Sequence, residues 1–272
     1  MKDAFSTFHP IVNFTYFTVV IVLSMFFMDP ILMGIGLISA LVYSSMLKGR
    51  KAVKFNLVYM LPLLLFMSIL NPLFNHQGMT ILFYMQDGNP ITLESIIYGV
   101  SSACMFVTTI LWFSCYNIVM TSDKFIYLFG KIMPALSLIF SMVLRFVPRY
   151  TAKIKAIKNA QKCVGRDISQ GKILKRAKNG IKILSIMTTW ALENAIETAD
   201  SMKSRGYGLP GRTSFSLFRF DSRDKIIITL MLGLLIATFS FASFAAYFLL
   251  CMLPVIINIT EEMKWKSIKS RT

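Results

Sequence analysis

The sequence has few residues of the kinds that build metal centres, disulfide frameworks and cofactor sites. It contains 4 cysteines, 2 histidines and 13 acidic residues among 272. The cysteines lie far apart without a C-x-x-C pair, and both histidines stand alone. We therefore expect no disulfide framework, no metal site and no cofactor, and we predict that the cysteines are small apolar packing residues.

The acidic residues are also too scattered to predict a catalytic centre. Asp29, Glu94 and Asp123 belong to loops or to the ends of apolar runs. A membrane enzyme acting on a phosphorylated lipid or isoprenoid is the alternative function, but metal-dependent versions need clustered carboxylates or histidines. A secondary permease would need ionisable groups inside its spans, and the apolar runs contain no convincing buried charge.

The chain also lacks a nucleotide-binding loop of its own. The nearest match runs from Gly165 to Lys172, with five residues between its glycines instead of four. Ile173 follows, where a serine or threonine should hold magnesium. ATP, if it is used, must be bound by another subunit.

Apolar residues, by contrast, are abundant and form long runs. They make up 55% of the chain, and the mean hydropathy is +0.61. A membrane span needs roughly 20 mostly apolar residues. We predict an all-α, polytopic membrane protein with about six spans, at Ile11–Met28, Ile31–Leu47, Phe55–Phe74, Ile96–Val119, Ile226–Phe239 and Phe241–Ile257.

The basic residues predict the orientation of these spans. Lys48, Arg50, Lys51 and Lys54 follow the second span, whereas the loop 75–90 contains no lysine or arginine. Because basic loops stay inside, we expect both termini to be cytoplasmic in a bacterial cell membrane. A single long helix over 226–257 would put the basic tail outside, so charge favours two spans there. Basic residues beside a bilayer, without a recognisable binding module, argue against nucleic acid as a partner.

The predicted organisation is a membrane domain with four spans (1–120), a cytoplasmic domain (121–224), a membrane hairpin (225–258) and a basic cytoplasmic tail (259–272). Within the cytoplasmic domain, Ile132–Leu144 predicts a short apolar helix that is too short to span, and its part Leu136–Leu144 is bounded by Pro134 and Pro148. A basic helix is expected after Arg145. A second long helix is expected from Lys172 to Ser204, with an apolar stripe at Ala177, Ile181, Leu184, Ala191, Ala195 and Met202.

Both long helices are predicted to end at a glycine. The two tripeptides are Cys163-Val164-Gly165 and Ser204-Arg205-Gly206. Glycine commonly follows a helix end because it accepts the left-handed conformation, so one such end carries little functional information. The informative feature is that two amphipathic helices of similar length end in the same way.

With these ends, the chain resembles the T component, the transmembrane coupling subunit of energy-coupling factor (ECF) type ABC importers, the CbiQ-like family. The matching blocks are Arg145-Phe146-Val147-Pro148, Ala160-Gln161, Leu192-Glu193-Asn194-Ala195, the run Ser201 to Gly208, and Gly211-Arg212-Thr213. The resemblance implies a non-catalytic subunit that joins two ABC ATPases to a substrate-binding membrane S component, for uptake of a vitamin or a metal cation. The short apolar helix is expected to offer a surface to that third protein.

The resemblance also implies which residues contact the ATPases. Family members end each coupling helix in an Ala-Arg-Gly-like motif that docks into an ATPase groove. The second motif here is Ser204-Arg205-Gly206, with Arg205 expected to contact a carboxylate. The first motif departs from the pattern, because Val164 stands where the arginine is expected and Arg166 lies two residues further on. Either Arg166 forms the ion pair from a shifted position, or the first contact is mainly apolar.

Overall fold

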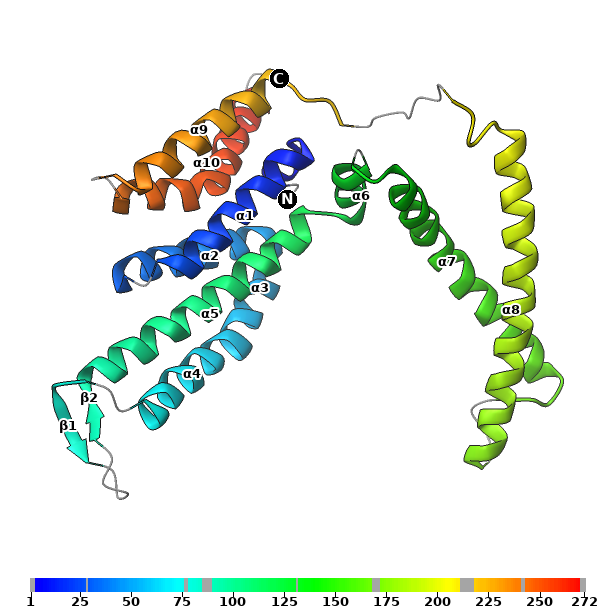
Figure 1. The fold of residues 1–272 in the computed structure, drawn as a ribbon, viewed down its shortest axis with the longest axis horizontal. Helices are drawn as coiled ribbons and strands as arrows, with labels where there is room; N and C mark the ends of the chain where they lie inside the picture. Colours follow the sequence, from blue (N-terminus) through cyan, green and yellow to red (C-terminus); the bar gives the residue numbers. More distant parts are fainter. Residues whose placement is uncertain are drawn as a thin grey trace. The chain divides into compact units, whose positions relative to one another are not determined.

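A computed structural model describes residues 3–27, 29–75, 78–84, 90–130, 132–167, 172–210, 218–240 and 243–269 (Figure 1). The predicted block at Gly211 to Thr213 lies outside these residues. The chain divides into two compact units. Unit 1 combines Met1–Leu128 with Phe218–Thr272, and unit 2 is Phe129–Leu217.

Unit 1 is built almost wholly from helices. They are the 3₁₀ turn η1 (Phe5–Thr7), α1 (Pro10–Phe26), α2 (Pro30–Lys48), α3 (Arg50–Phe55), the π-helical turn η2 (Asn56–Met60), α4 (Leu61–Phe74), α5 (Leu93–Val119), α6 (Ser122–Gly130), α9 (Ser222–Thr238) and α10 (Ser243–Lys269). Proline begins both α1 and α2, where its missing N–H costs no hydrogen bond. The Thr92 hydroxyl caps α5 by accepting a hydrogen bond from the Ser95 amide (3.3 Å).

Four helical segments, among the residues that the structure describes, are long and apolar enough to cross a membrane. They are Pro30–Lys48, Arg50–Phe74, Leu93–Val119 and Phe244–Lys269. The prediction of an all-α multi-pass protein is confirmed, but the count of six spans is not. The helices α1 and α9 have 17 residues each, which reach about 26 Å, short of a hydrocarbon core of roughly 30 Å. The break between α9 and α10 agrees with two helices over 226–257, and α10 continues to Lys269 through most of the predicted tail.

The core of unit 1 consists of aromatic and aliphatic side chains from α1, α2, α5 and α10. Tyr16, Phe17, Tyr43, Trp112 and Tyr247 are almost fully buried in it. Helix association in lipid depends on close packing, because lipid tails are as apolar as the side chains. A glycine in α5 shows this closeness: a Cβ at Gly99 would lie 2.8 Å from the Ser68 carbonyl of α4.

A two-stranded antiparallel sheet lies between α4 and α5 and was not predicted. Strands β1 (Ile81–Tyr84) and β2 (Pro90–Thr92) pair with Ile81 opposite Thr92 and Tyr84 opposite Pro90. All four residues of β1 are exposed.

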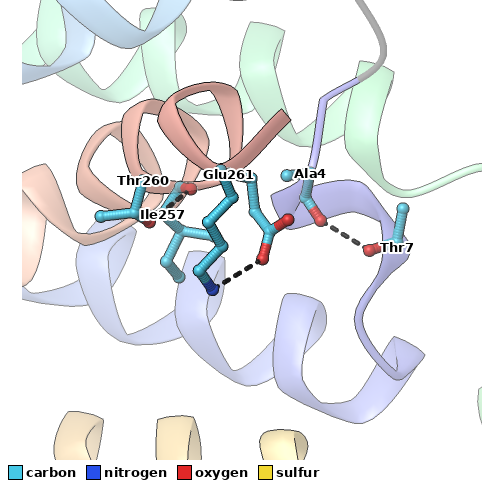
Figure 2. A network of polar contacts seen from close by, with 6 residues as sticks. Ala4, Thr7, Ile257, Thr260 and Glu261 are labelled. Atoms are coloured by element: carbon cyan, nitrogen blue, oxygen red, sulfur yellow. Dashed lines mark hydrogen bonds and ion pairs between the residues drawn. The ribbon is translucent and has the colours of Figure 1, made fainter. Parts of the chain in front are cut away.

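The amino-terminal segment is held against the end of the bundle opposite this sheet. Figure 2 shows Ala4 and Thr7 beside the turn of α10 that carries Ile257, Thr260 and Glu261. The Ala4 amide donates to Asn258 Oδ1 (2.6 Å), and the Tyr43 hydroxyl donates to Asp3 (3.2 Å). The Lys124 ammonium donates to the Ser6 and Val119 carbonyls, and burial lowers its pKa. Buried polar groups with partners on several elements fix this segment in place.

Unit 2 contains two long helices, α7 (Pro134–Cys163) and α8 (Ile173–Ser204). The prediction for 172–204 is therefore confirmed to within one residue. The apolar helix predicted at Ile132–Leu144 is not a separate element, because α7 begins at Pro134 and continues past Leu144 and through Pro148 to Cys163. A proline removes only one N–H donor and its fixed φ is helical, so a long helix can retain it at a local cost. The Thr151 hydroxyl donates to the Pro148 carbonyl at this point (2.8 Å).

Candidate functional site

The helices α7 and α8 cross through a small apolar and aromatic contact (Figure 1). Ile157 of α7 packs against Ile183 and Met187 of α8, and all three are less than 10% exposed. The Tyr150 ring meets the Trp190 ring edge to face, with centroids 5.3 Å apart. We name Tyr150, Ile157, Ile183, Met187 and Trp190 the crossing cluster.

Two cations extend this cluster on the α7 side. The Arg149 guanidinium lies 5.7 Å from the centre of the Trp190 ring, and the Lys153 ammonium lies 5.0 Å from it. Each such contact contributes about 0.5–1 kcal/mol at a partly exposed site. Two of the basic residues of α7, Arg149 and Lys153, therefore stabilise the crossing.

The predicted apolar stripe of α8 is not the face that packs on α7. Ile181 and Leu184 are 68% and 66% exposed, whereas Ile183 and Met187 are buried. The helix has apolar residues on more than one face, and the sequence period did not distinguish the face that α7 covers. The predicted stripe at Ala177, Ile181, Leu184, Ala191, Ala195 and Met202 lies within α8, but its members Ile181 and Leu184 are not on the face that packs on α7.

The end of α7 forms a Schellman motif. Cys163 is the last helical residue, Val164 is the C-cap, and Gly165 has φ of 75°. The Gly165 amide donates to the Lys162 carbonyl (3.0 Å), and the Arg166 amide donates to the Gln161 carbonyl (2.9 Å). These are the two bonds that define the motif, and the left-handed conformation is one that glycine adopts without strain.

The end of α8 repeats this geometry residue by residue. Arg205 is the C-cap and Gly206 has φ of 74°. The Gly206 amide donates to the Lys203 carbonyl (2.9 Å), and the Tyr207 amide donates to the Met202 carbonyl (3.1 Å). The backbone angles of the two C-caps agree closely, at φ −88° and ψ 12° for Val164 against φ −87° and ψ 7° for Arg205.

This equivalence fixes the alignment of the two motifs. Val164 occupies the position of Arg205, and Arg166 occupies the position of Tyr207. The side chain of Val164 is 67% exposed, and those of Cys163, Arg166, Ser204 and Arg205 are also exposed. The two helix ends therefore present the same backbone shape with different chemistry at the C-cap: an apolar side chain at one and a guanidinium at the other.

The structure does not bring the two motifs together. The Asn179 side chain donates to the Asp167 carbonyl (3.0 Å), so the first motif lies beside the start of α8. From Asn179 to Ser204, a rise of 1.5 Å per residue places the second motif roughly 37 Å away along the helix. The predicted site residues thus form two separate surfaces, one at each end of α8.

The loop after the first motif is also held by an ion pair. The Lys162 ammonium lies 3.8 Å from the Asp167 carboxylate, with Lys162 mostly exposed. Such a pair contributes at most about 1 kcal/mol. Together with the Asn179 hydrogen bond, it limits the freedom of Arg166, which lies between Lys162 and Asp167.

The sequence analysis did not predict the crossing cluster, which holds together the two helices that carry the site residues. Tyr150 and Trp190 were the available signal, because each is a large aromatic residue on an amphipathic helix. Asn194, part of a motif block, was also not singled out, although it is buried on α8 one turn beyond Trp190. Among the described residues, no three His, Cys, Asp or Glu side chains cluster as a metal site.

These features define the class of the protein: a multi-pass, all-α membrane protein with a pair of crossed amphipathic helices. The sequence profile of the family described as CbiQ, Cobalt transport protein, matches residues 5–217. The chain belongs to this family.

Curated relatives agree with this membership. An energy-coupling factor transporter transmembrane protein EcfT from Lactobacillus helveticus is 37% identical over 105 residues, or 37% of this chain and 38% of the relative. A protein of the same name from Acidaminococcus fermentans is 31% identical over 157 residues, or 54% of this chain and 59% of the relative. The chain thus spans less than two thirds of the length of each of these relatives. Their names describe a transmembrane component of a transporter, as predicted.

Proposed function

We propose that this chain is the transmembrane coupling subunit of an ECF-type ABC importer. In this role it joins two ABC ATPase subunits to a substrate-binding membrane protein, and ATP-driven motion passes through α7 and α8. The cargo is a vitamin or a metal cation, bound by the other membrane protein.

The observation that carries the proposal is the pair of equivalent helix ends. Each presents an exposed C-cap side chain beside a left-handed glycine that lets a partner backbone approach closely. Two copies of the same geometry suit two copies of one kind of partner. At the second end, Arg205 offers a rigid fork of donors to a carboxylate on that partner.

The arrangement of unit 1 supports an orientation with both termini in the cytoplasm. Tyr43, one turn before the basic residues that begin at Lys48, bonds to Asp3, and Asn258 of α10 bonds to Ala4. The amino terminus, the basic turn after α2 and the basic end of α10 therefore gather at one end of the bundle. That end is cytoplasmic by the positive-inside rule.

The test is purification of the tagged full-length chain from gently solubilised bacterial membranes, followed by identification of partners and measurement of ATPase activity. We expect the wild type to recover ATPase subunits and a small hydrophobic protein. Arg205→Glu should lose the ATPases, because a like charge replaces one half of an interface ion pair whose loss costs about 2–5 kcal/mol. Lys155→Glu makes the same charge change at an exposed position within α7 and should retain them.

Further variants resolve the chemistry of the first helix end. The alignment of Val164 with Arg205 favours an apolar first contact, so Val164→Glu should weaken ATPase recovery more than Arg166→Glu does. The opposite order would show that Arg166 supplies the ion pair from its shifted position. Unchanged recovery in Arg205→Glu, or a wild-type chain that purifies alone and hydrolyses a phosphorylated lipid, would refute the proposed function.

A further inference from the structure

A buried histidine lies where the chain leaves unit 1 for unit 2 and where it returns. His9 precedes α1 and is 5% exposed. Its ring meets the Tyr127 ring of α6 edge to face, with centroids 5.4 Å apart. It meets the Phe220 ring of the returning segment in the same way, at 5.3 Å. One side chain thus contacts both connections between the units.

The hydrogen bonds at His9 determine its tautomer. The Ile11 amide donates to Nδ1 of His9 (3.3 Å), so Nδ1 carries no proton. The Nε2 atom lies 3.3 Å from the Tyr127 hydroxyl, which itself donates to the Phe218 carbonyl (3.2 Å). When the phenol proton is directed at the Phe218 carbonyl, His9 donates from Nε2 to the Tyr127 oxygen. The result is a directed chain from α1 through α6 to the returning segment.

The returning segment is bound to α1 a second time. The His9 amide donates to Oδ1 of Asp224 (3.0 Å), and Oδ2 of Asp224 accepts from the Asp221 amide (2.9 Å). Asp224 is 4% exposed and lies in the first turn of α9. Its carboxylate therefore joins the start of α1 to the start of α9. Buried polar groups satisfied in this way hold a specific geometry, because leaving any of them unpaired is costly.

We propose that His9 and Tyr127 form the joint through which motion of unit 2 passes to helices α1 and α9 of unit 1. The inference rests on the proposed function, since it needs ATP-driven motion of α7 and α8. The covalent chain leaves unit 1 after Leu128 and returns at Phe218. Tyr127 links the two connections between the units to each other, and His9 links both connections to α1. Without these bonds, we expect the two connections to move independently, so that motion of unit 2 no longer reaches α1. Both residues act by positioning.

The test measures this motion directly, because the cargo is not identified. Spin labels on non-canonical amino acids at Val22 of α1 and Leu192 of α8, both exposed, report the distance between the units in the purified, reconstituted complex. Distances are recorded with MgADP and after trapping with MgATP and vanadate, beside the ATPase rate and the yield of complex. Tyr127→Phe keeps the ring and deletes the bridging hydroxyl. His9→Asn keeps a favoured N-cap residue but is too short to reach Tyr127.

We expect each variant to reduce the nucleotide-driven population shift by roughly 2- to 30-fold, with the ATPase rate and complex yield unchanged. The double variant should be no worse than the more severe single one, because both remove the same bond. The control Tyr84→Phe, at an exposed tyrosine of β1, should behave as wild type.

A full shift in Tyr127→Phe, or effects of the two substitutions that add, would overturn the inference. A nucleotide-driven population shift that falls only in proportion to the yield of complex would also overturn the inference, because it would indicate a purely structural role. A wild-type chain without ATPase partners, or without any nucleotide-driven shift, would instead refute the proposed function. The two failures are thus distinguishable.

Discussion

Trp190→Ala should open the crossing of α7 and α8. The substitution removes the edge-to-face contact with Tyr150, which contributes about 0.5–1.5 kcal/mol. It also removes the cation contacts of Arg149 and Lys153 with the ring, about 0.5–1 kcal/mol each. These contributions add to about 1.5–3.5 kcal/mol, with a central value of about 2–3 kcal/mol. That is below the typical cost of truncating a fully buried tryptophan, about 3–5 kcal/mol, as expected for a half-buried side chain.

Hydrogen exchange followed by mass spectrometry on the full-length chain in detergent measures this opening. A loss of about 2–3 kcal/mol corresponds to roughly 30- to 150-fold faster exchange of the amides around Ile157 and Ile183, because each 1.4 kcal/mol is a factor of ten. Helices of unit 1 should exchange as in the wild type. Leu192→Ala, at a 63% exposed position two residues further along α8, is the matched control and should change exchange little. Equal effects of the two substitutions would refute the assignment of the crossing cluster.

Two further predictions concern glycines. Gly165→Ala and Gly206→Ala should each destabilise their helix end by about 1 kcal/mol, because alanine is strained at φ near 75°. The loss of stability should be larger for Gly206→Ala, since its Cβ would meet a Leu209 methyl at 3.2 Å. Exchange of the last-turn amides measures both, and an unchanged end in either variant would contradict the Schellman assignment. Gly99→Ala should lower the thermal midpoint of the solubilised chain by forcing α4 away from α5, whereas Gly34→Ala, with no atom within 4 Å of the new Cβ, should leave it unchanged or raise it.

The helix α8 was predictable because its limits are encoded locally. A polar, basic start and a glycine after Ser204 are both local signals of helix ends. The course of α7 was not predictable in the same way. Pro148 is a local signal for a break, but the helix persists because its length on both sides outweighs one lost hydrogen bond. The number of spans differs for another reason: hydropathy locates apolar runs, whereas the helices that form over the first and fifth runs, α1 and α9, have only 17 residues each.

The candidate site was predicted as residues but not as geometry. Sequence reasoning singled out the tripeptides ending at Gly165 and Gly206, and both end a helix in the structure. The equivalence of Val164 with Arg205 became visible only from backbone angles and hydrogen bonds. The face of α8 that packs on α7 depends on partners distant in sequence. Periodicity within α8 therefore could not predict that Ile183, and not Ile181, packs against α7.

The unequal chemistry of the two Schellman ends has a consequence for assembly. If both ends bind ATPase subunits, a homodimer of identical ATPases meets a cation at one subunit and an aliphatic group at the other. Salt would then weaken one attachment and leave the other nearly unaffected, since screening acts on charges and not on apolar contacts. Raising the ionic strength should detach one nucleotide-binding subunit before its twin, and the complex would come apart in a defined order.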